Sequence, residues 1–181
     1  MLGMKLVRLI ERHAEALAED VTEEIRNSER TSDFRKIQPQ EVQAAALEVY
    51  RNLGEWLLQK TEKEIEPRFR AVAGRRAVEG IGMHQVVWAL TLSRDHLLHF
   101  LRLEAFADSI VQLHGELEVR LLLNQFFDRA IYYAILGYDE ARQQTAKNEL
   151  ARARELAISI GLMSARPAPE SSEERSQGES R

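Results

Sequence analysis

Apolar residues recur every three or four positions over most of the chain, the spacing that places side chains on one face of an α-helix. The first such stretch predicts a helix over residues 2–27. A polar, turn-rich segment follows over 27–38, in which we expect a short helical turn near Phe34. A second helix is expected from Pro39 to about residue 58, because the first helical position does not need the N–H that proline lacks.

The next predicted helix has two possible starts and one clear end. It begins either at Thr61, whose hydroxyl and Glu64 fit a capping box, or at Pro67. It ends near Gly80 and Gly82, since glycine readily adopts the left-handed conformation that terminates a helix.

Two more helices complete the prediction. One covers about 83–103, and the last runs from Asp108, a good N-cap residue, towards Gly161. No alternation of apolar and polar residues bounded by turn signals is found, so strands are not expected. The pattern therefore predicts an all-α fold, a bundle of about five helices with a long C-terminal helix. We expect one domain over 1–161, followed by a disordered tail over 162–181 that has little to bury.

The last helix would be about 80 Å long at 1.5 Å per residue, which exceeds the width of a domain of this size. Its middle, residues 120–138, is apolar around most of its circumference. One side must pack against its own chain, and the other needs cover because soluble monomers rarely expose large apolar patches. We therefore expect a two-fold homodimer through this helix. The residues expected at the interface are Phe126, Phe127, Ile131, Ile135 and Tyr138.

Composition narrows the range of partners and compartments. The 181 residues carry a formal net charge of -4, which disfavours binding to nucleic acid or to an anionic membrane surface. No apolar run approaches the roughly 18 residues of a membrane span. The absence of cysteine excludes disulfides and thiolate chemistry, and it is compatible with the cytoplasm, where we expect the protein to be found.

Several polar residues interrupt or flank the apolar faces of the helices before and after Gly80. Arg76 and Arg94 fall within apolar arcs, where a guanidinium is costly unless it is paired. Such arginines either pair with a neighbouring carboxylate such as Glu79, or form a buried polar cluster that binds an anion or acts as a switch. We expect a hinge between the two helices, and its candidate residues are Arg76, Glu79, Trp88 and Arg94. His99 is a further candidate for binding a ligand.

No motif in the sequence nominates a catalytic centre or a metal site. His96 and His99, with His114 as a third group, point in directions about 60° apart and match no known metal motif, so we expect no metal and no cofactor. A haem held by one of these histidines is the open alternative, as part of a ligand pocket between the last three helices. The segment 75–94 mimics a helix-turn-helix, but Arg76 occupies the place of a small residue. We expect the protein not to be an enzyme.

Three short segments carry a family resemblance. They are RAVEGI at 76–81, VVWAL at 86–90 and FFDRA at 126–130, within a region spanning about 10–145. This region resembles the N-terminal domain of RsbRD-type RsbT co-antagonist proteins. The resemblance implies a bacterial sensory or regulatory module, involved in signal transduction and stress response and related to the non-haem globin-like domain of RsbR. It further implies dimerisation, signal output through the last helix and a regulatory partner of the kinase or STAS type.

Overall fold

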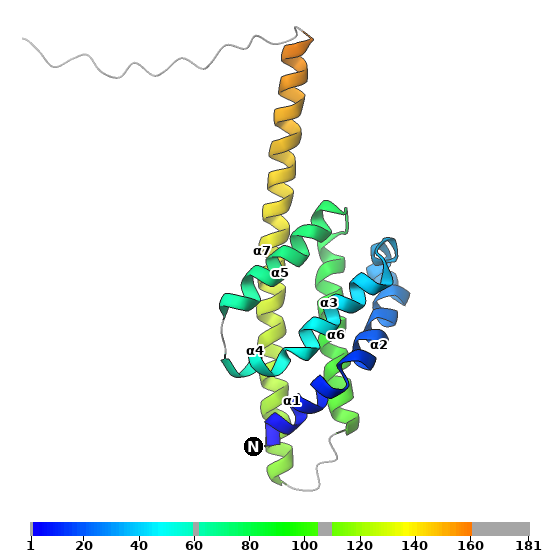
Figure 1. The fold of residues 1–181 in the computed structure, drawn as a ribbon, viewed down its shortest axis with the longest axis vertical. Helices are drawn as coiled ribbons and strands as arrows, with labels where there is room; N and C mark the ends of the chain where they lie inside the picture. Colours follow the sequence, from blue (N-terminus) through cyan, green and yellow to red (C-terminus); the bar gives the residue numbers. More distant parts are fainter. Residues whose placement is uncertain (1, 60–61, 105–109, 161–181) are drawn as a thin grey trace, which may run out of the picture. The chain divides into compact units, whose positions relative to one another are not determined.

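The computed structural model describes residues 2–59, 62–104 and 110–160, and within these ranges the chain folds into helices joined by short connections (Figure 1). No strand occurs in these ranges, so the all-α prediction is confirmed. The chain divides into two units, Met1–Gln144 and Thr145–Arg181, and the fold described next is that of the first. The helices are α1 (Leu2–Arg12), α2 (Ala14–Asn27), the 3-10 helix η1 (Glu29–Lys36), α3 (Pro39–Arg51), α4 (Leu53–Gln59), α5 (Glu62–Val78), α6 (Met83–Glu104) and α7 (Ile110–Ser159).

The first two predicted helices are each broken once. The backbone leaves the helical conformation at His13 (φ -98°, ψ 10°) and at Asn52 (φ -104°, ψ 7°). These breaks separate α1 from α2 and α3 from α4, so that α2 packs along α3 while α1 contacts α4. The apolar periodicity continues through both breaks, which is why the sequence pattern alone predicts one helix in each place.

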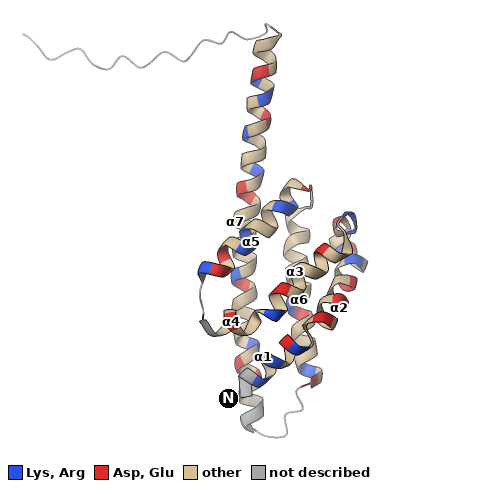
Figure 2. Cartoon of the chain, in the orientation of Figure 1, with Lys and Arg blue, Asp and Glu red and all other residues tan. Residues whose placement is uncertain are grey.

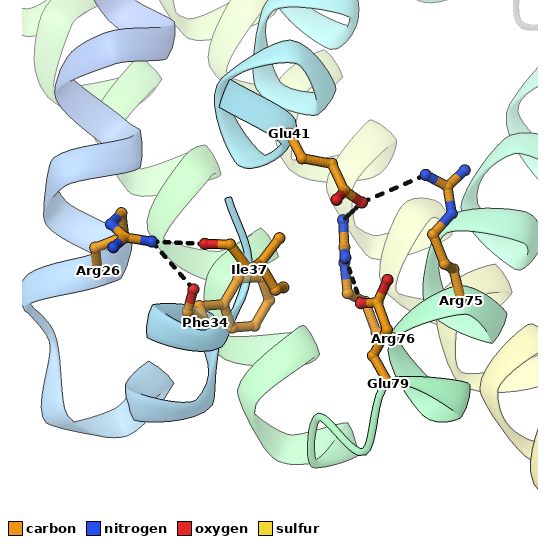
Figure 3. Close-up of polar contacts among 7 residues, drawn as sticks. All are labelled: Arg26, Phe34, Ile37, Glu41, Arg75, Arg76 and Glu79. Atoms are coloured by element: carbon orange, nitrogen blue, oxygen red, sulfur yellow. Dashed lines mark hydrogen bonds and ion pairs between the residues drawn. The ribbon is translucent and has the colours of Figure 1, made fainter. Parts of the chain in front are cut away.

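The segment predicted as a loop with a short turn is more ordered than expected. It forms η1, and Phe34 is buried against the core. The guanidinium of Arg26 holds this segment by donating hydrogen bonds to the carbonyl oxygens of Phe34 (3.3 Å) and Ile37 (2.8 Å) (Figure 3). The prediction of a helical turn near Phe34 is therefore confirmed, and a kink at Thr31 (φ -127°, ψ 32°) separates this turn from the start of η1.

The predicted stop after α5 is also confirmed. Gly80 adopts φ 76°, the left-handed conformation, and the Ile81 N–H donates to the Arg76 carbonyl at 2.9 Å. At its other end α5 begins at Glu62 and continues through Pro67. Of the two predicted starts, Thr61 is therefore closer to the observed one than Pro67. Thr61, the predicted capping residue, lies outside the described residues, as does Asp108 before α7.

Helix α5 crosses α7 at a point of close backbone contact (Figure 1). A Cβ atom at Gly137 would lie 2.3 Å from both the Cα and the carbonyl oxygen of Arg70, so only glycine fits there. Across the same contact, Gly74 lies close to the Gly137 carbonyl. These two glycines allow the helices to approach closely and fix where α5 sits on α7.

Beside this crossing, an aromatic cluster fills the core. The ring of Phe126 stacks on Trp56 with centroids 5.8 Å apart and meets Phe69 and Phe127 edge-on, at 5.9 and 5.2 Å. Phe126 and Phe127 are 3% and 1% exposed in the single chain. Their predicted position at a subunit interface is therefore corrected: both rings lie in the core of their own chain, where α4 and α5 cover Phe126 and Phe127 contacts Phe126 and lines a cavity.

The second unit contains the end of α7, residues 145–159, in which nearly every side chain is exposed. Acidic and basic residues alternate along this part of the helix (Figure 2). The predicted disordered tail over 162–181 lies outside the described residues. None of the described helices combines the length and the apolar character that crossing a bilayer requires.

Candidate functional site

The most notable polar group of the fold is the buried guanidinium of Arg76, which is 4% exposed. It donates to Glu41 at 2.7 Å and to Glu79 at 2.5 Å, and Arg75 reaches the same Glu41 oxygen at 3.4 Å (Figure 3). We call these four residues the Arg76 cluster. It joins the start of α3 to the end of α5.

The ends of the two helices favour this arrangement electrostatically. Glu41 lies in the first turn of α3, where the helix dipole stabilises a negative charge. Arg75 and Arg76 lie in the last turn of α5, where it stabilises positive charge. The hydrogen bond and the charge of Arg76 hold the pKa of Glu41 below its ordinary value of 4.5. Glu41 is therefore ionised at neutral pH.

A second ion pair lies two turns earlier on α5. Arg68 pairs with Glu48 of α3, and its guanidinium lies 5.4 Å from the ring of Trp56. Only 16% of the Arg68 side chain is exposed, and burial lowers the pKa of this guanidinium below its ordinary value. Arg68 stays charged at physiological pH nonetheless, because arginine titrates so far above neutrality.

Behind these two ion pairs lies a partly open cavity of about 90 Å³. Residues of α2, η1, α3, α5, α6 and α7 line it, and most of them are alanine, valine, leucine, isoleucine or phenylalanine. The polar side chains at its wall have partners within the protein. The Tyr50 hydroxyl donates to the Ser93 carbonyl at 3.3 Å, and the Ser93 hydroxyl donates to the Ala89 carbonyl at 2.9 Å. Burial raises the pKa of Tyr50 well above its ordinary value of 10, so the phenol stays neutral.

Of the candidate hinge and ligand residues predicted from the sequence, only two contact each other. Arg76 and Glu79 do meet, as the pairing interpretation requires. Trp88 instead lies under Arg30 of η1, whose guanidinium carbon is 4.3 Å from the ring centroid. Arg94 pairs with its neighbour Asp95, and His99 lies exposed on α6 beside Arg102. The structure thus does not gather the five candidates into one site.

The histidines lie away from the cavity. None of its lining residues is a histidine, and His96 instead approaches Glu24 at 3.4 Å. Within the described residues, no group of three or more histidines, aspartates or glutamates is arranged to hold a metal ion. A haem is also far larger than 90 Å³, so this cavity does not fit the haem version of the ligand pocket.

Sequence reasoning missed the α3 half of the site. Glu41 and Glu48 are the partners of Arg76 and Arg68, and they lie 35 and 20 residues away along the chain. A signal was present, because acidic residues at 41 and 48 and basic residues at 68 and 76 each recur on one helical face. Deciding that these two faces meet requires the antiparallel packing of α3 and α5, which the chain pattern does not specify.

One further contact links the Arg76 cluster to α7. Tyr138, predicted at the dimer interface, donates its hydroxyl proton to the Ile81 carbonyl at 2.9 Å. Ile81 in turn donates its N–H to the carbonyl of Arg76. The turn between α5 and α6 is thereby bonded to α7 on one side and to the Arg76 cluster on the other.

The sequence of the chain matches the profile of a known family of protein domains. The profile of the RsbT co-antagonist protein RsbRD N-terminal domain matches residues 15–153. This range includes the Arg76 cluster, the cavity and most of α7. Neither the curated proteins nor the solved structures gave a significant match.

Proposed function

The chain belongs to the family of RsbT co-antagonist RsbRD N-terminal domains, and from this premise we propose that it is a non-enzymatic regulatory module that pairs with a second copy through α7. A domain of this family takes part in signal transduction. The proposal places the protein in the cytoplasm, where it acts on a regulatory partner of the kinase or STAS type.

The observation that supports the dimer is an apolar stripe left open on α7. Leu117, Leu121 and Tyr132 are 54%, 58% and 57% exposed, and Ile135 is 38% exposed. At 100° per residue these four side chains fall within about 60° of one another around the helix. We call them the α7 stripe. Large apolar side chains gathered on one face of a soluble domain typically mark an interaction surface.

A second copy of the chain is the occupant that best fits the α7 stripe. A stripe on one straight helix is complementary to itself, since two copies related by a two-fold axis place the same residues on both sides. Of the interface residues predicted from the sequence, Ile135 belongs to this stripe, Ile131 is half-buried next to it and Tyr138 is half-buried and bonded to Ile81. The proposed interface therefore lies on the same helix as predicted, but on its opposite face from Phe126 and Phe127.

The proposed mechanism is a small shift or rotation of α7. Such a movement changes the stripe that α7 offers, and it acts on the turn between α5 and α6 through the bond from Tyr138 to Ile81. Through Ile81 it reaches the Arg76 cluster. A change at the cluster and a change at the dimer surface are thus coupled in both directions.

Light scattering at micromolar concentration tests the dimer. We expect the purified chain to have twice its monomer mass of 20.8 kDa. The double variant Leu121→Glu/Ile135→Glu should be monomeric, because two like charges would meet across the two-fold axis. Val78→Glu is the matched control, since Val78 is an exposed apolar residue on α5, at 71% exposure, outside the stripe. A monomeric wild-type chain, or a double variant that stays dimeric, would refute the proposal.

Ligand sensing is the second candidate function, and the internal cavity favours it. Its volume of about 90 Å³ restricts the ligand to a small molecule.

A further inference from the structure

The cavity lies directly behind the contact between α3 and α5. On the outer side of the same contact is an open groove, lined only by residues of these two helices. The cavity and the groove share four lining residues, namely Ala45, Arg68, Val72 and Arg76. These four side chains therefore form the partition between the interior and the solvent.

The partition has a regular construction. Arg68, Val72 and Arg76 are spaced four apart and share one face of α5, while Glu41, Ala45 and Glu48 share one face of α3. Arg76 pairs with Glu41 at one end and Arg68 with Glu48 at the other, in antiparallel order. Between the two ion pairs stand only Ala45 and Val72, whose side chains are small. We call this arrangement the α3–α5 window.

The two ion pairs are the removable part of the window. The carboxylates of Glu41 and Glu48 face the solvent, with 38% and 54% of their side chains exposed. Water can replace either arginine as a partner of these carboxylates, so opening a pair does not strand a buried negative charge. The guanidinium has to move out into the groove and be hydrated there at the same time, because the Arg76 and Arg68 side chains are only 5% and 16% exposed where they stand. The remainder of the cavity wall is packed core, in which comparable movement would open apolar contacts to water.

The chemistry of the wall determines what can occupy the cavity. Its polar side chains, Tyr50, Ser93, Arg68 and Arg76, are all bonded to other protein groups. A water molecule needs two to four polar partners, and an apolar cavity without them stays dry and accepts apolar molecules. An anion would have to displace Glu41 or Glu48 from the arginines, so a charged ligand is disfavoured.

We propose that the cavity is a binding site for a small uncharged apolar molecule, of at most about five carbon atoms, which enters through the α3–α5 window. The occupant would touch Phe127, so binding is communicated directly to α7. This inference does not depend on dimerisation, because every residue that it uses lies in the first unit of a single chain.

Binding is tested on the full chain with xenon and with cyclopentane as probes. Both should shift the methyl NMR signals of Val42, Val72 and Val86, which line the cavity, in a saturable manner. Butyrate, similar in size but charged, should leave them unshifted. Absence of saturable shifts with both uncharged probes, or equal binding of butyrate, would overturn the proposed site.

Filling the cavity provides the matched comparison. Ala89→Leu on α6 and, from another wall, Ala46→Leu on α3 should each weaken binding of the probes at least tenfold. Ala151→Leu, the same substitution at an exposed position of α7, should bind them like the wild type. Wild-type affinity in both filled variants would show that the probes bind elsewhere and would overturn the assignment.

The route is tested separately by exchange kinetics. In Glu41→Gln/Glu48→Gln the rates of probe binding and release should both rise at least fivefold, with an affinity within twofold of wild type, because neither carboxylate lines the cavity. Glu29→Gln is the control, since Glu29 pairs with Arg35 on the exposed surface of η1 and lines neither the cavity nor the groove. Unchanged rates in the double variant would overturn the α3–α5 window as the way in.

Discussion

Of the charged residues that the structure describes, Arg76 is the most completely buried, and its environment explains how the domain accommodates it. A guanidinium removed from water is costly unless its donors are satisfied. Two carboxylates satisfy them here, one from its own helix and one from α3. Glu41 and Glu79 keep part of their hydration, with 38% and 34% of their side chains exposed, so the cluster is not wholly desolvated.

Replacing the guanidinium tests this balance. We expect Arg76→Met to lower the free energy of unfolding by about 1–2 kcal/mol, because bonds to charged groups are lost while the apolar stem is retained. Arg75→Met should cost less than about 0.5 kcal/mol, since the Arg75 side chain is 59% exposed. Urea denaturation measures both. If both variants lost the same free energy of unfolding, burial of the Arg76 guanidinium would not explain its contribution to stability.

The lowered pKa of Glu41 makes a further prediction about acid stability. A carboxyl whose pKa is lower in the folded than in the unfolded state stabilises the fold above its unfolded value, here near 4.5. That stabilisation is lost as the pH falls from about 4.5 through the lower folded value. We expect Glu41→Gln to reduce the slope of unfolding free energy against pH in this range, measured by urea titrations at pH 3–6. The exposed Glu23→Gln should leave the slope nearer that of the wild type.

At the scale of the helices, the position of α5 on α7 depends on a close contact between their backbones. Helix α5 has Ala73, Gly74 and Ala77 near its contact with α7, and α7 offers Gly137. These small residues bring the two axes close enough for Tyr138 to bond the turn after α5. The glycine pair therefore determines the geometry through which α7 acts on the rest of the bundle.

Two glycine substitutions distinguish the effect of a steric contact on stability from the effect of helix propensity. Each Gly→Ala change in a helix interior should gain about 1 kcal/mol from propensity alone. At Gly137 the new Cβ would lie 2.3 Å from the Arg70 backbone, so Gly137→Ala should destabilise the fold by about 1–3 kcal/mol in spite of that gain. At Gly74 the nearest atom, the Gly137 carbonyl oxygen, would lie 3.3 Å from the new Cβ, a tight contact that a shift of a few tenths of an ångström relieves, so Gly74→Ala should be less destabilising than Gly137→Ala. Thermal unfolding measures the stability of both variants. A Gly137→Ala variant as stable as the wild type would contradict the close backbone contact between α5 and α7.

Elements were largely predictable from the sequence, whereas their contacts were not. Helical periodicity, Pro39 and the stop at Gly80 depend on local physics, and the structure confirms them. The breaks at His13 and Asn52 interrupt an apolar periodicity that continues through them, so the pattern alone does not place them, although the Asn52 side chain donates to the Glu48 carbonyl at 2.7 Å. Likewise, Phe126 and Phe127 are apolar enough for either a core or an interface, and only the position of α4 and α5 over them determines which. The pairing of Arg76 with Glu41 depends on the same non-local packing.

At the scale of the whole molecule, the buried core and the exposed end of α7 occupy different parts of the chain. The buried apolar residues that the structure describes all precede residue 135, while the side chains of 145–156 are exposed. The core of the first unit is therefore complete without the second. What residues 145–160 add is exposed helix carrying charges of both signs (Figure 2).

Truncation tests this division. A chain that ends after Gln144 should keep the unfolding free energy of the full chain to within about 1 kcal/mol, because no described core residue is removed. Its urea m-value should also change little, since m follows the surface that unfolding exposes. Circular dichroism and urea titration provide both values. A loss of several kcal/mol would show that the second unit supports the fold.

The position of Trp56 has a practical consequence. The chain has two tryptophans, and Trp56 lies both against Phe126 in the core and 5.4 Å from the Arg68 guanidinium of the α3–α5 window. Trp88 lies instead under Arg30, at η1. Replacing Trp88 with phenylalanine would leave a single indole, whose emission wavelength and quenching by acrylamide respond to movement of Arg68. The indole of Trp56 is thus a built-in optical reporter of the opening that we propose for the α3–α5 window.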